Sequence, residues 1–527
     1  MCYPVASVVA IARGKISDVD WREPILCWMD GVEEGWAIPI FLVGFVVAWQ
    51  AFLSIAYFGG DLHPDVLETW TFGRSLEWGY PKHPPLMGWV ARAWTSVFPL
   101  TNWSFQLLAL TNSAIAMWIV DLIARRFVKG DKRLIVLLLL MLQPTYQFHA
   151  QRFNANAVLL AAWPLATWCF LRSFETRRIG WAVAAGAAAA LAVLGKYYSL
   201  VLIASFAIAA MVHPQRRAYF GSSAPWVSAL TGLVALAPHL HWLATTGAEP
   251  CVYALSTHAG KPFDVALTQA LLFLPGVALA LALPAAAWVL IAGDKLKRFR
   301  ADFQALNPQL WLLLLITAAT MVLPPITALA MRTDMQPIWA LQGVFMIEIL
   351  AVCGASYSIA RVQSVNLTAA MAGVVAFAVF VAAPVHMLYR NSYPLHEGRN
   401  FYRPAAEELT RRWHAQFDAP LPAVGGDDDL ALALAFYSPD HPIYENRLVN
   451  PRMKRVPDSA DLARGWAALC FDEDANCIGA VEETAARGPG FVKFEFTVRS
   501  ELLGQPGASQ RFAALMVPPA VRPTNGD

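Results

Sequence analysis

One loop between two long apolar segments combines carboxylates, cations and a rigid double proline. Asp65 and Glu68 stand three residues apart, so they share one face if a helix begins near Asp65. Lys82 and His83 come directly before two prolines, whose rings restrict the backbone and so fix the direction of the chain. A carboxylate can accept a proton, and a pair of cations can bind a phosphate. The loop therefore predicts an acid–base group and a phosphate-binding pair.

The same residues allow a purely structural interpretation. The run His-Pro-Asp-x-x-Glu is typical of a helix start, with Asp65 as the N-cap and Glu68 folding back as in a capping box. Taken alone, the carboxylates leave both interpretations open. The basic pair in the same loop favours chemistry, since capping does not require it.

The chain around this loop has the composition of a membrane protein. It is 57% hydrophobic and 15% charged, whereas an ordinary soluble domain is about 25% charged. Residues 36–58 carry no charge over a length that lets a helix cross ~30 Å of hydrocarbon. The net charge of +2 is too small to indicate a nucleic-acid partner. The sequence predicts a mainly α, polytopic helical bundle in the bilayer.

The apolar runs predict about eleven spans: 36–58, 104–124, 133–149, 156–172, 180–195, 198–213, 224–243, 267–292, 309–330, 338–355 and 366–387. Lys and Arg cluster in every second connection, and the positive-inside rule makes those connections cytoplasmic. We therefore expect a multi-pass plasma (inner) membrane protein with a cytoplasmic N-terminus. The loop 59–103 and the C-terminal domain are expected on the periplasmic or extracellular side.

Four parts of the chain follow from this topology. Residues 1–35 form a cytoplasmic segment without the pattern of a cleavable signal peptide, and 36–388 form the transmembrane domain. Residues 389–517 are predicted to be a small soluble α/β domain, because a helix is expected at 405–417 and an alternating strand at 491–498. Residues 518–527 are expected to be a disordered tail.

The cysteines add one prediction about the C-terminal domain. Cys470 and Cys477 are close in sequence and would lie in an oxidising compartment, so they could form a disulfide; two free thiols are the alternative. No spacing of Cys and His resembles a zinc site, and no metal ion is predicted from them.

The loop motif also resembles a known family. The run Asp65-x-x-Glu68, Gly73-Arg74, Gly79-Tyr80 and Lys82-His83-Pro84-Pro85-Leu86 resembles the signature loop of the GT-C class of membrane glycosyltransferases. The similarity is to the bacterial branch near protein O-mannosyltransferases and lipid A aminoarabinose transferases, and it extends to about residue 387. It implies a GT-C bundle whose partners are the lipid bilayer and a polyprenyl-phosphate sugar donor. Transfer would occur on the non-cytoplasmic face, with inversion at the anomeric carbon.

The resemblance implies roles for individual residues. Asp65 would be the general base for an acceptor hydroxyl on a glycan, lipid or protein, with Glu68 second in line. The donor phosphate would contact Lys82, His83, Arg74, Lys196 and Arg152, while Asn154, Asn156 and Tyr80 would bind substrate. The family often has an acidic residue where this chain has Lys82, so the motif does not support a divalent metal, and no cofactor is expected.

Several of these residues have structural alternatives. Asn154 and Asn156 could cap the following helix, and Lys196 could be a snorkelling residue at a span end. His239 and His241 are expected in an interfacial aromatic belt, and Asp334 in a surface ion pair with Arg332.

A second function remains open from the sequence. A transporter or flippase of lipid-linked sugars would also need many spans and polar groups for a lipid phosphate. Transporters usually place charges near the bilayer midplane and have broken helices in paired repeats. The predicted spans are almost free of charge and have no convincing repeat, which favours the transferase.

Overall fold

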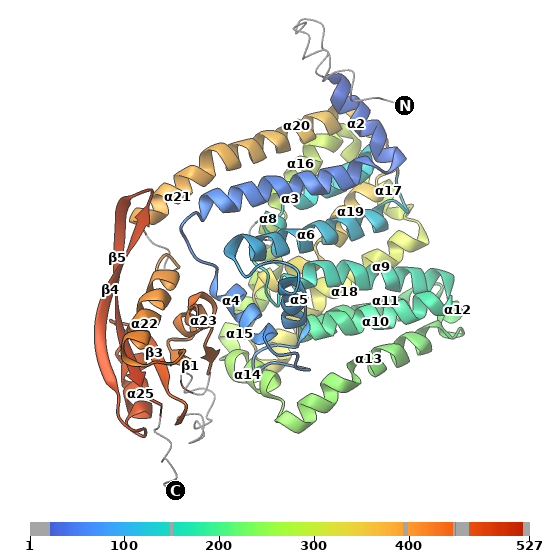
Figure 1. Cartoon of the computed structure of the whole chain (residues 1–527). Coiled ribbons are helices and arrows are strands. Elements are labelled where there is room, and N and C mark those ends of the chain that lie inside the picture. Colours follow the sequence, from blue (N-terminus) through green and yellow to red (C-terminus); the bar gives the residue numbers. More distant parts are fainter. Residues whose placement is uncertain (1–21, 148–150, 394–398, 446–447, 449–462, 520–527) are drawn as a thin grey trace, which may run out of the picture. The chain divides into compact units, whose positions relative to one another are not determined.

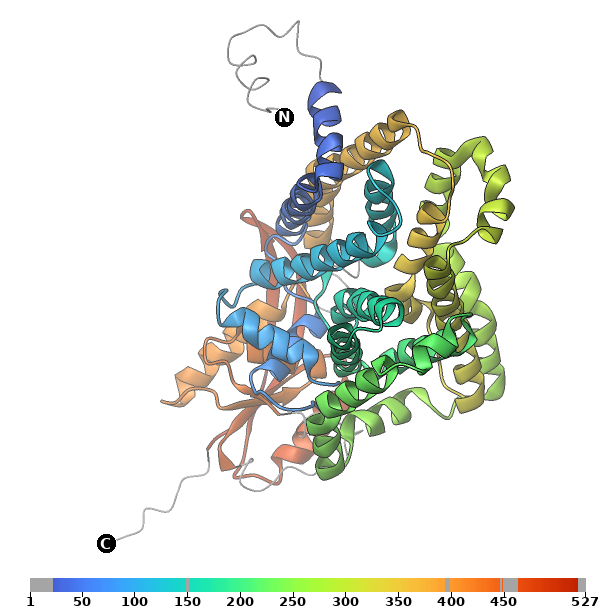
Figure 2. The same ribbon diagram turned by 90° about the vertical axis from the view of Figure 1, so that its right-hand side faces the viewer.

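The computed structural model describes residues 22–147, 151–393, 399–445, 448 and 463–519 (Figures 1 and 2). The expectations for residues 1–21 and for most of the C-terminal tail lie outside these residues. The chain divides into two compact units. The helical unit contains residues 1–50, 77–89 and 106–377, and the sheet unit contains 51–76, 90–105 and 378–527. The loop 59–103 is therefore shared between them.

The helical unit takes its helices from the N-terminal and central parts of the chain. They are α2 (Arg22–Glu34), most of α3 (Ala37–Ala56) and α6 (Asn102–Ala124), α7 (Asp131–Met141), α8 (Pro144–Gln147), α9 (Val158–Thr176), α10 (Ile179–Gly195), η3 (Tyr197–Ser199), α11 (Leu200–Val212), α12 (Arg216–Phe220), α13 (Ala224–Thr246), α14 (Glu249–His258), α15 (Phe263–Ala280), α16 (Ala282–Ala292), η4 (Gly293–Arg298), α17 (Phe299–Gln304), α18 (Pro308–Met331), η5 (Pro337–Gly343), α19 (Phe345–Cys353) and α20 (Arg361–Phe377).

The alanine-rich helix α10 packs between α9 and α13, as both views show (Figures 1 and 2). Small residues allow this approach, because a Cβ on Gly186 would stand 2.2 Å from the carbonyl oxygen of Ser228. Close backbone contact through Gly and Ala is a common way for helices to associate in a membrane. The three helices fix the position of the chain just after α10, where Lys196 lies.

Six helices in the described part of the chain are long and apolar enough to span a membrane: Ala37–Ala56, Asn102–Ala124, Ala224–Thr246, Phe263–Ala280, Pro308–Met331 and Arg361–Ser392. The mainly helical class is confirmed, whereas the count of about eleven spans is not. Two of the predicted spans correspond to α7 and α19, which have 11 and 9 residues. At 1.5 Å per residue neither reaches across ~30 Å of hydrocarbon.

The sheet unit contains α4 (Pro64–Gly73), the end of α5 (Leu86–Thr95), α21 (Ala383–Ser392), α22 (Tyr402–Gln416), β1 (Ala423–Gly426), α23 (Asp428–Tyr437), β2 (Ile443–Tyr444), β3 (Trp466–Phe471), α25 (Ala475–Ala485), β4 (Val492–Leu502) and β5 (Gln505–Val517). The strand order is β2-β1-β3-β5-β4. β1 pairs in parallel with β2 and β3, and β5 pairs antiparallel with β3 and β4. The helix predicted at 405–417 and the strand predicted at 491–498 are present as α22 and β4, in a unit that also includes residues 51–76 and 90–105.

Local sequence explains the two longest strands. Leu503 and Gly504 connect β4 to β5 with positive φ angles of 50° and 77°, as a two-residue hairpin turn requires. Along β4, alternate residues from Phe496 to Leu502 are buried while those between them are exposed, which is the period of a strand with one covered face.

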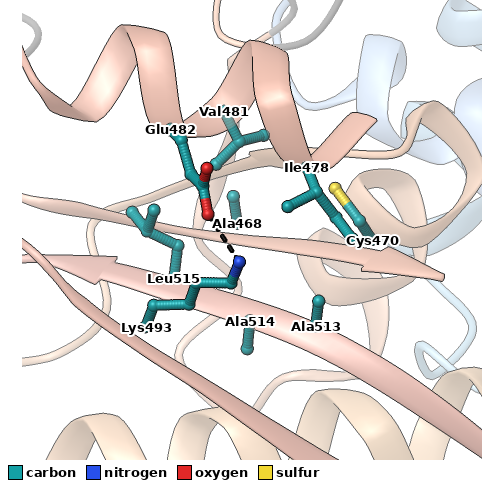
Figure 3. Close-up of a pocket in the computed structure, with 9 residues that line it drawn as sticks. All are labelled: Ala468, Cys470, Ile478, Val481, Glu482, Lys493, Ala513, Ala514 and Leu515. Carbon is teal, nitrogen blue, oxygen red and sulfur yellow. Dashed lines mark hydrogen bonds and ion pairs between the residues drawn. The ribbon is translucent and has the colours of Figure 1, made fainter. Parts of the chain in front are cut away.

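The core of the sheet unit lies between β3, β5 and α25. Trp466, Ala468 and Leu515 pack with Val481 and Ala485 of α25. The disulfide predicted between Cys470 and Cys477 is present and joins β3 to α25. Figure 3 shows a small hollow beside it, crossed by a 2.6 Å ion pair between Lys493 and Glu482. Its lining is mostly apolar and includes none of the residues predicted for acid–base chemistry or phosphate binding.

Candidate active site

Asp65 lies in the first turn of α4 and is not its N-cap. The cap is His63, whose Nδ1 accepts the N–H of Asp65 at 3.2 Å, and Pro64 occupies the first helical position. The capping-box interpretation of Asp65 and Glu68 is therefore wrong, because the imidazole takes the role assigned to the carboxylate. The Asp65 side chain is 48% exposed, with its Oδ2 3.6 Å from His63 Nδ1. The positive end of the helix dipole favours a negative charge at this position.

Glu68 has a different environment from Asp65. It is 7% exposed, and its negative charge contributes to raising the pKa of Tyr444 in the same unit. Desolvation, followed by the neighbouring Asp428 and Glu68, raises the pKa of Tyr444 well above its ordinary value. Of the two predicted carboxylates, only Asp65 has a substantially exposed side chain.

The predicted phosphate-binding pair lies in a closed turn of the helical unit. The Tyr80 N–H donates to the carbonyl of His83 at 2.9 Å, and the Tyr80 ring is 2% exposed. The ring packs on Gly88, since a Cβ there would stand 2.5 Å from the Tyr80 hydroxyl. Burial and the nearby Glu77 raise the pKa of Tyr80. Tyr80 therefore closes the turn, while Lys82 and His83 are partly exposed on it.

Helix α13 holds the start of this turn. A Cβ on Gly79 would stand 2.3 Å from the ring of Trp242, so the backbone of the turn lies directly against that ring. His239 Nδ1 contacts the carbonyl of Trp78, and its Nε2 lies 3.0 Å from the Tyr197 hydroxyl. His239 is 1% exposed. The expectation that His239 belongs to an interfacial belt is wrong, because both ring nitrogens have polar partners inside the protein.

Lys196 has partners that a snorkelling residue would lack. Its Nζ donates to Asn156 Oδ1 at 2.6 Å and lies 5.3 Å from the centre of the Trp339 ring, at a cation–π distance. The preceding Gly195 is in contact with the start of α5, since a Cβ there would stand 3.6 Å from Leu86. Leu86 directly follows the double proline. The helical unit therefore brings Lys196 and Asn156 close to the segment that carries Lys82 and His83.

The two predicted asparagines differ in what they contact. Asn154 Oδ1 accepts the N–H groups of Asn156 and Ala157, each at 2.9 Å, in the turn leading into α9. These bonds hold the turn before the helix and do not cap it, because the N-cap of α9 is Ala157 and has no side-chain cap bond. The Asn156 side chain instead accepts from Lys196. Arg152 is partly buried just before this turn.

Arg74 lies in the sheet unit, at the C-terminal end of α4. Its guanidinium donates to the carbonyls of Pro442 and His441 at 2.7 and 2.8 Å, and desolvation lowers its pKa. These two contacts direct the cation towards the backbone of the C-terminal domain. Such contacts were not anticipated from the sequence, because the partners are 368 and 367 residues away along the chain.

Three residues near Lys196 were missed or misassigned from the sequence. Asp334 pairs with His258 at 2.7 Å, which corrects the expected pair with Arg332. The ring of His258 lies edge-on to Trp339, with centroids 5.1 Å apart. Trp339, two residues after Pro337, was the available signal, but its neighbours come from segments distant in sequence.

Comparisons with known proteins agree with this fold. The family profile "Dolichyl-phosphate-mannose-protein mannosyltransferase" matches residues 82–242. The lipid A galacturonosyltransferase RgtD of Rhizobium johnstonii is 26% identical over 180 residues, which cover 34% of this chain and 37% of that protein. The match thus spans little more than a third of the relative.

The structure is similar to that of ArnT from Cupriavidus metallidurans. The crystal structure of ArnT bound to undecaprenyl phosphate has a TM-score of 0.59 and 15% identity, covering 90% of this chain and 97% of that one. The apo structure of ArnT gives a TM-score of 0.56 at 14% identity over the same shares. At such identities the likeness establishes the fold alone.

The fold and the family profile point the same way as the loop motif: the structure is similar to that of ArnT, and residues 82–242 match the mannosyltransferase profile. Both findings are consistent with the predicted resemblance to GT-C membrane glycosyltransferases of the aminoarabinose-transferase branch.

Proposed function

We propose that this protein transfers a sugar from a polyprenyl-phosphate donor to an acceptor hydroxyl on the non-cytoplasmic side of the membrane. Support for the donor comes from the fold shared with ArnT, which is described as bound to undecaprenyl phosphate. Support for an acceptor of the lipid kind comes from the similarity to a lipid A galacturonosyltransferase. The proposed topology has a cytoplasmic N-terminus and places the C-terminal domain outside.

In the proposed reaction, the acceptor oxygen attacks the anomeric carbon as Asp65 takes its proton. The bond between that carbon and the phosphate oxygen breaks, and the electron pair leaves with the polyprenyl phosphate. Attack opposite the leaving group inverts the anomeric configuration. The departing phosphate is already acidic, so it needs cations rather than a proton donor. Lys82, His83, Lys196 and Arg152 are assigned this role.

The environment of Asp65 carries the proposal. A general base needs a carboxylate that solvent and substrate can approach. The Asp65 side chain is half exposed, and His63 caps the helix in its place. Glu68 is buried and is assigned no proton transfer.

The test is sugar transfer by the full-length protein in proteoliposomes. Donors are undecaprenyl phosphate carrying mannose, aminoarabinose or galacturonic acid, and the acceptor is lipid A. Asp65→Asn is expected to lower kcat by about 10²–10⁴-fold, the range of general acid–base catalysis, while undecaprenyl phosphate still binds. Asp264→Asn is the matched control, since Asp264 also lies in the first turn of an α-helix and is exposed. NMR of the product reports the anomeric configuration.

The same assay separates the transferase from a flippase. A flippase moves the intact donor between leaflets, so the labelled sugar stays on the prenyl lipid and Asp65→Asn has little effect. Retained configuration in the product would contradict the single-displacement step. Unchanged transfer by Asp65→Asn would remove Asp65 from the role of base.

A further inference from the structure

The helix that carries Asp65 is attached to the C-terminal domain at both of its ends. Helix α4 packs against α23 within the sheet unit. These helices come from opposite ends of the sequence, yet they belong to one compact body. The contacts at the two ends of α4 involve different residues of the C-terminal domain.

Tyr437, the last residue of α23, holds the N-terminal end. Its hydroxyl accepts the N–H of Leu62 at 2.8 Å and donates to Asn102 Oδ1 at 2.9 Å. Asn102 in turn donates to the carbonyl of Gly60 at 2.7 Å. Desolvation, followed by the charge of Asp61, raises the pKa of Tyr437 well above its ordinary value, so the hydroxyl keeps its proton. The bonded backbone at Leu62 is three residues before Asp65.

Arg74 holds the other end. Its two terminal nitrogens donate to the carbonyls of His441 and Pro442, four and five residues after Tyr437. The guanidinium also lies 5.1 Å from the centre of the Trp70 ring, and that ring meets Phe436 edge-on at 5.2 Å. Because the guanidinium is planar and has two carbonyl partners, it fixes both the distance and the orientation of the end of α4 relative to residues 441 and 442. A single short segment, 436–442, therefore contacts α4 from both sides of Asp65.

We propose that Tyr437 and Arg74 are positioning residues for sugar transfer, through which the C-terminal domain sets the place and direction of the Asp65 carboxylate. This role rests on the proposed function, in which Asp65 is the base. A misplacement of about 1 Å in a reacting group can cost 10²-fold in rate. A helix of ten residues fixed at both ends cannot slide or rotate by that amount without breaking one of these contacts.

The test uses the full-length protein with the three undecaprenyl-phosphate sugars and lipid A. Tyr437→Phe removes the hydroxyl contacts and keeps the ring beside Phe436, so folding is preserved. We expect kcat to fall about 10–100-fold, with unchanged KM for the donor and unchanged undecaprenyl phosphate binding. Hydrogen exchange of residues 60–70 should become faster. Tyr393→Phe is the control, because Tyr393 is 63% exposed in the same unit.

A second pair of variants tests the other end of α4. Arg74→Met should lower kcat in the same way, and Arg74→Lys should recover part of the loss, because an ammonium can still donate to one carbonyl. A purely structural role would show equal losses in the two variants, with lower thermal stability and weaker donor binding. That result would overturn the positioning role.

The remaining outcomes separate this inference from the proposed function. If the wild type transfers sugar and Asp65→Asn does not, but Tyr437→Phe and Arg74→Met keep the wild-type kcat, positioning is refuted and the function stands. If the wild type transfers sugar from none of the three donors, the proposed function fails and the positioning role fails with it.

Discussion

Asp65 and Lys82 belong to one loop of the sequence and to two different compact units of the fold. Asp65 is on a short helix of the sheet unit, fixed by a tyrosine hydroxyl and an arginine of that unit. Lys82 is in a turn of the helical unit that packs against α13 through Gly79 and Trp242. The proposed proton-accepting group and the proposed phosphate-binding groups thus have separate supports.

The two supports differ in their physical nature. The basic side is held by transmembrane-type packing, with small residues in close contact and a buried histidine. The acidic side is held by hydrogen bonds between backbone groups and the side chains of Tyr437 and Arg74 within the sheet unit. Changes on the basic side should therefore affect donor binding. Changes on the acidic side should affect the chemical step. The predictions below test this division.

The largest expected effect concerns the scaffold of the helical unit. Asp121 of α6 accepts two bonds from Arg133 of α7, at 2.8 and 2.6 Å, and Asp121 is 2% exposed. Asp121→Asn leaves the buried guanidinium without its counter-charge, so we expect a loss of about 3–5 kcal/mol in the free energy of unfolding. Thermal denaturation in detergent measures it. Asp294→Asn, which removes an exposed ion pair with Lys297, should cost less than about 1 kcal/mol.

The second prediction concerns donor binding. Lys196→Met removes a charged donor beside Asn156 and Trp339. Hydrogen bonds to charged groups contribute about 1.5–3 kcal/mol, so binding of undecaprenyl phosphate should weaken about 10–150-fold. Lys261→Met is the control, because wild-type Lys261 also donates to a protein oxygen, the carbonyl of Thr257. Equal binding by Lys196→Met and wild type, or weakened binding by Asp65→Asn, would break the division between the two sides.

Local sequence predicted the parts of the fold that depend on neighbouring residues. The helix at 405–417 and the strand at 491–498 follow from their periods, and the disulfide follows from short spacing. The cap of α4 was missed because the helix begins at Pro64, two residues before the start expected from an Asp65 cap, and histidine is not a typical cap. The partners of Arg74 and His239 could not be predicted, since they depend on contacts between distant segments.

The third prediction concerns the scaffold of the sheet unit. The disulfide between Cys470 and Cys477 closes a loop with a sequence separation of 7. The entropy of closing so small a loop corresponds to roughly 2.5 kcal/mol. The double variant Cys470→Ser/Cys477→Ser should lower the stability of the sheet unit by about that amount, without changing undecaprenyl phosphate binding. Cys251→Ser, at a free cysteine of the helical unit, is the control. Weakened lipid binding in the double variant would mean that the units do not support separate functions.

The fourth prediction is a pH dependence of the sheet unit. Asp61 is 4% exposed, and one of its carboxylate oxygens accepts the N–H of Arg403 at 3.3 Å. Desolvation raises the pKa of Asp61 to about 7, against the opposing effects of Arg403 and Arg390. The folded state then binds the proton more tightly than the unfolded state. The cost of ionising Asp61 is absent below the ordinary pKa of 3.8, increases between there and about 7, and is constant above.

Stability relative to Asp61→Asn should therefore fall as pH rises from about 4 to 7, by at most about 1.4 kcal/mol per pH unit. Thermal denaturation of both proteins across this range gives the difference. Asp418→Asn, at an exposed site of the same unit, is the control. A difference that stays flat from pH 4 to 7 would mean that Arg403 and Arg390 offset or outweigh desolvation. Asp61 would then be an ionised partner that binds α22 to the chain before α4.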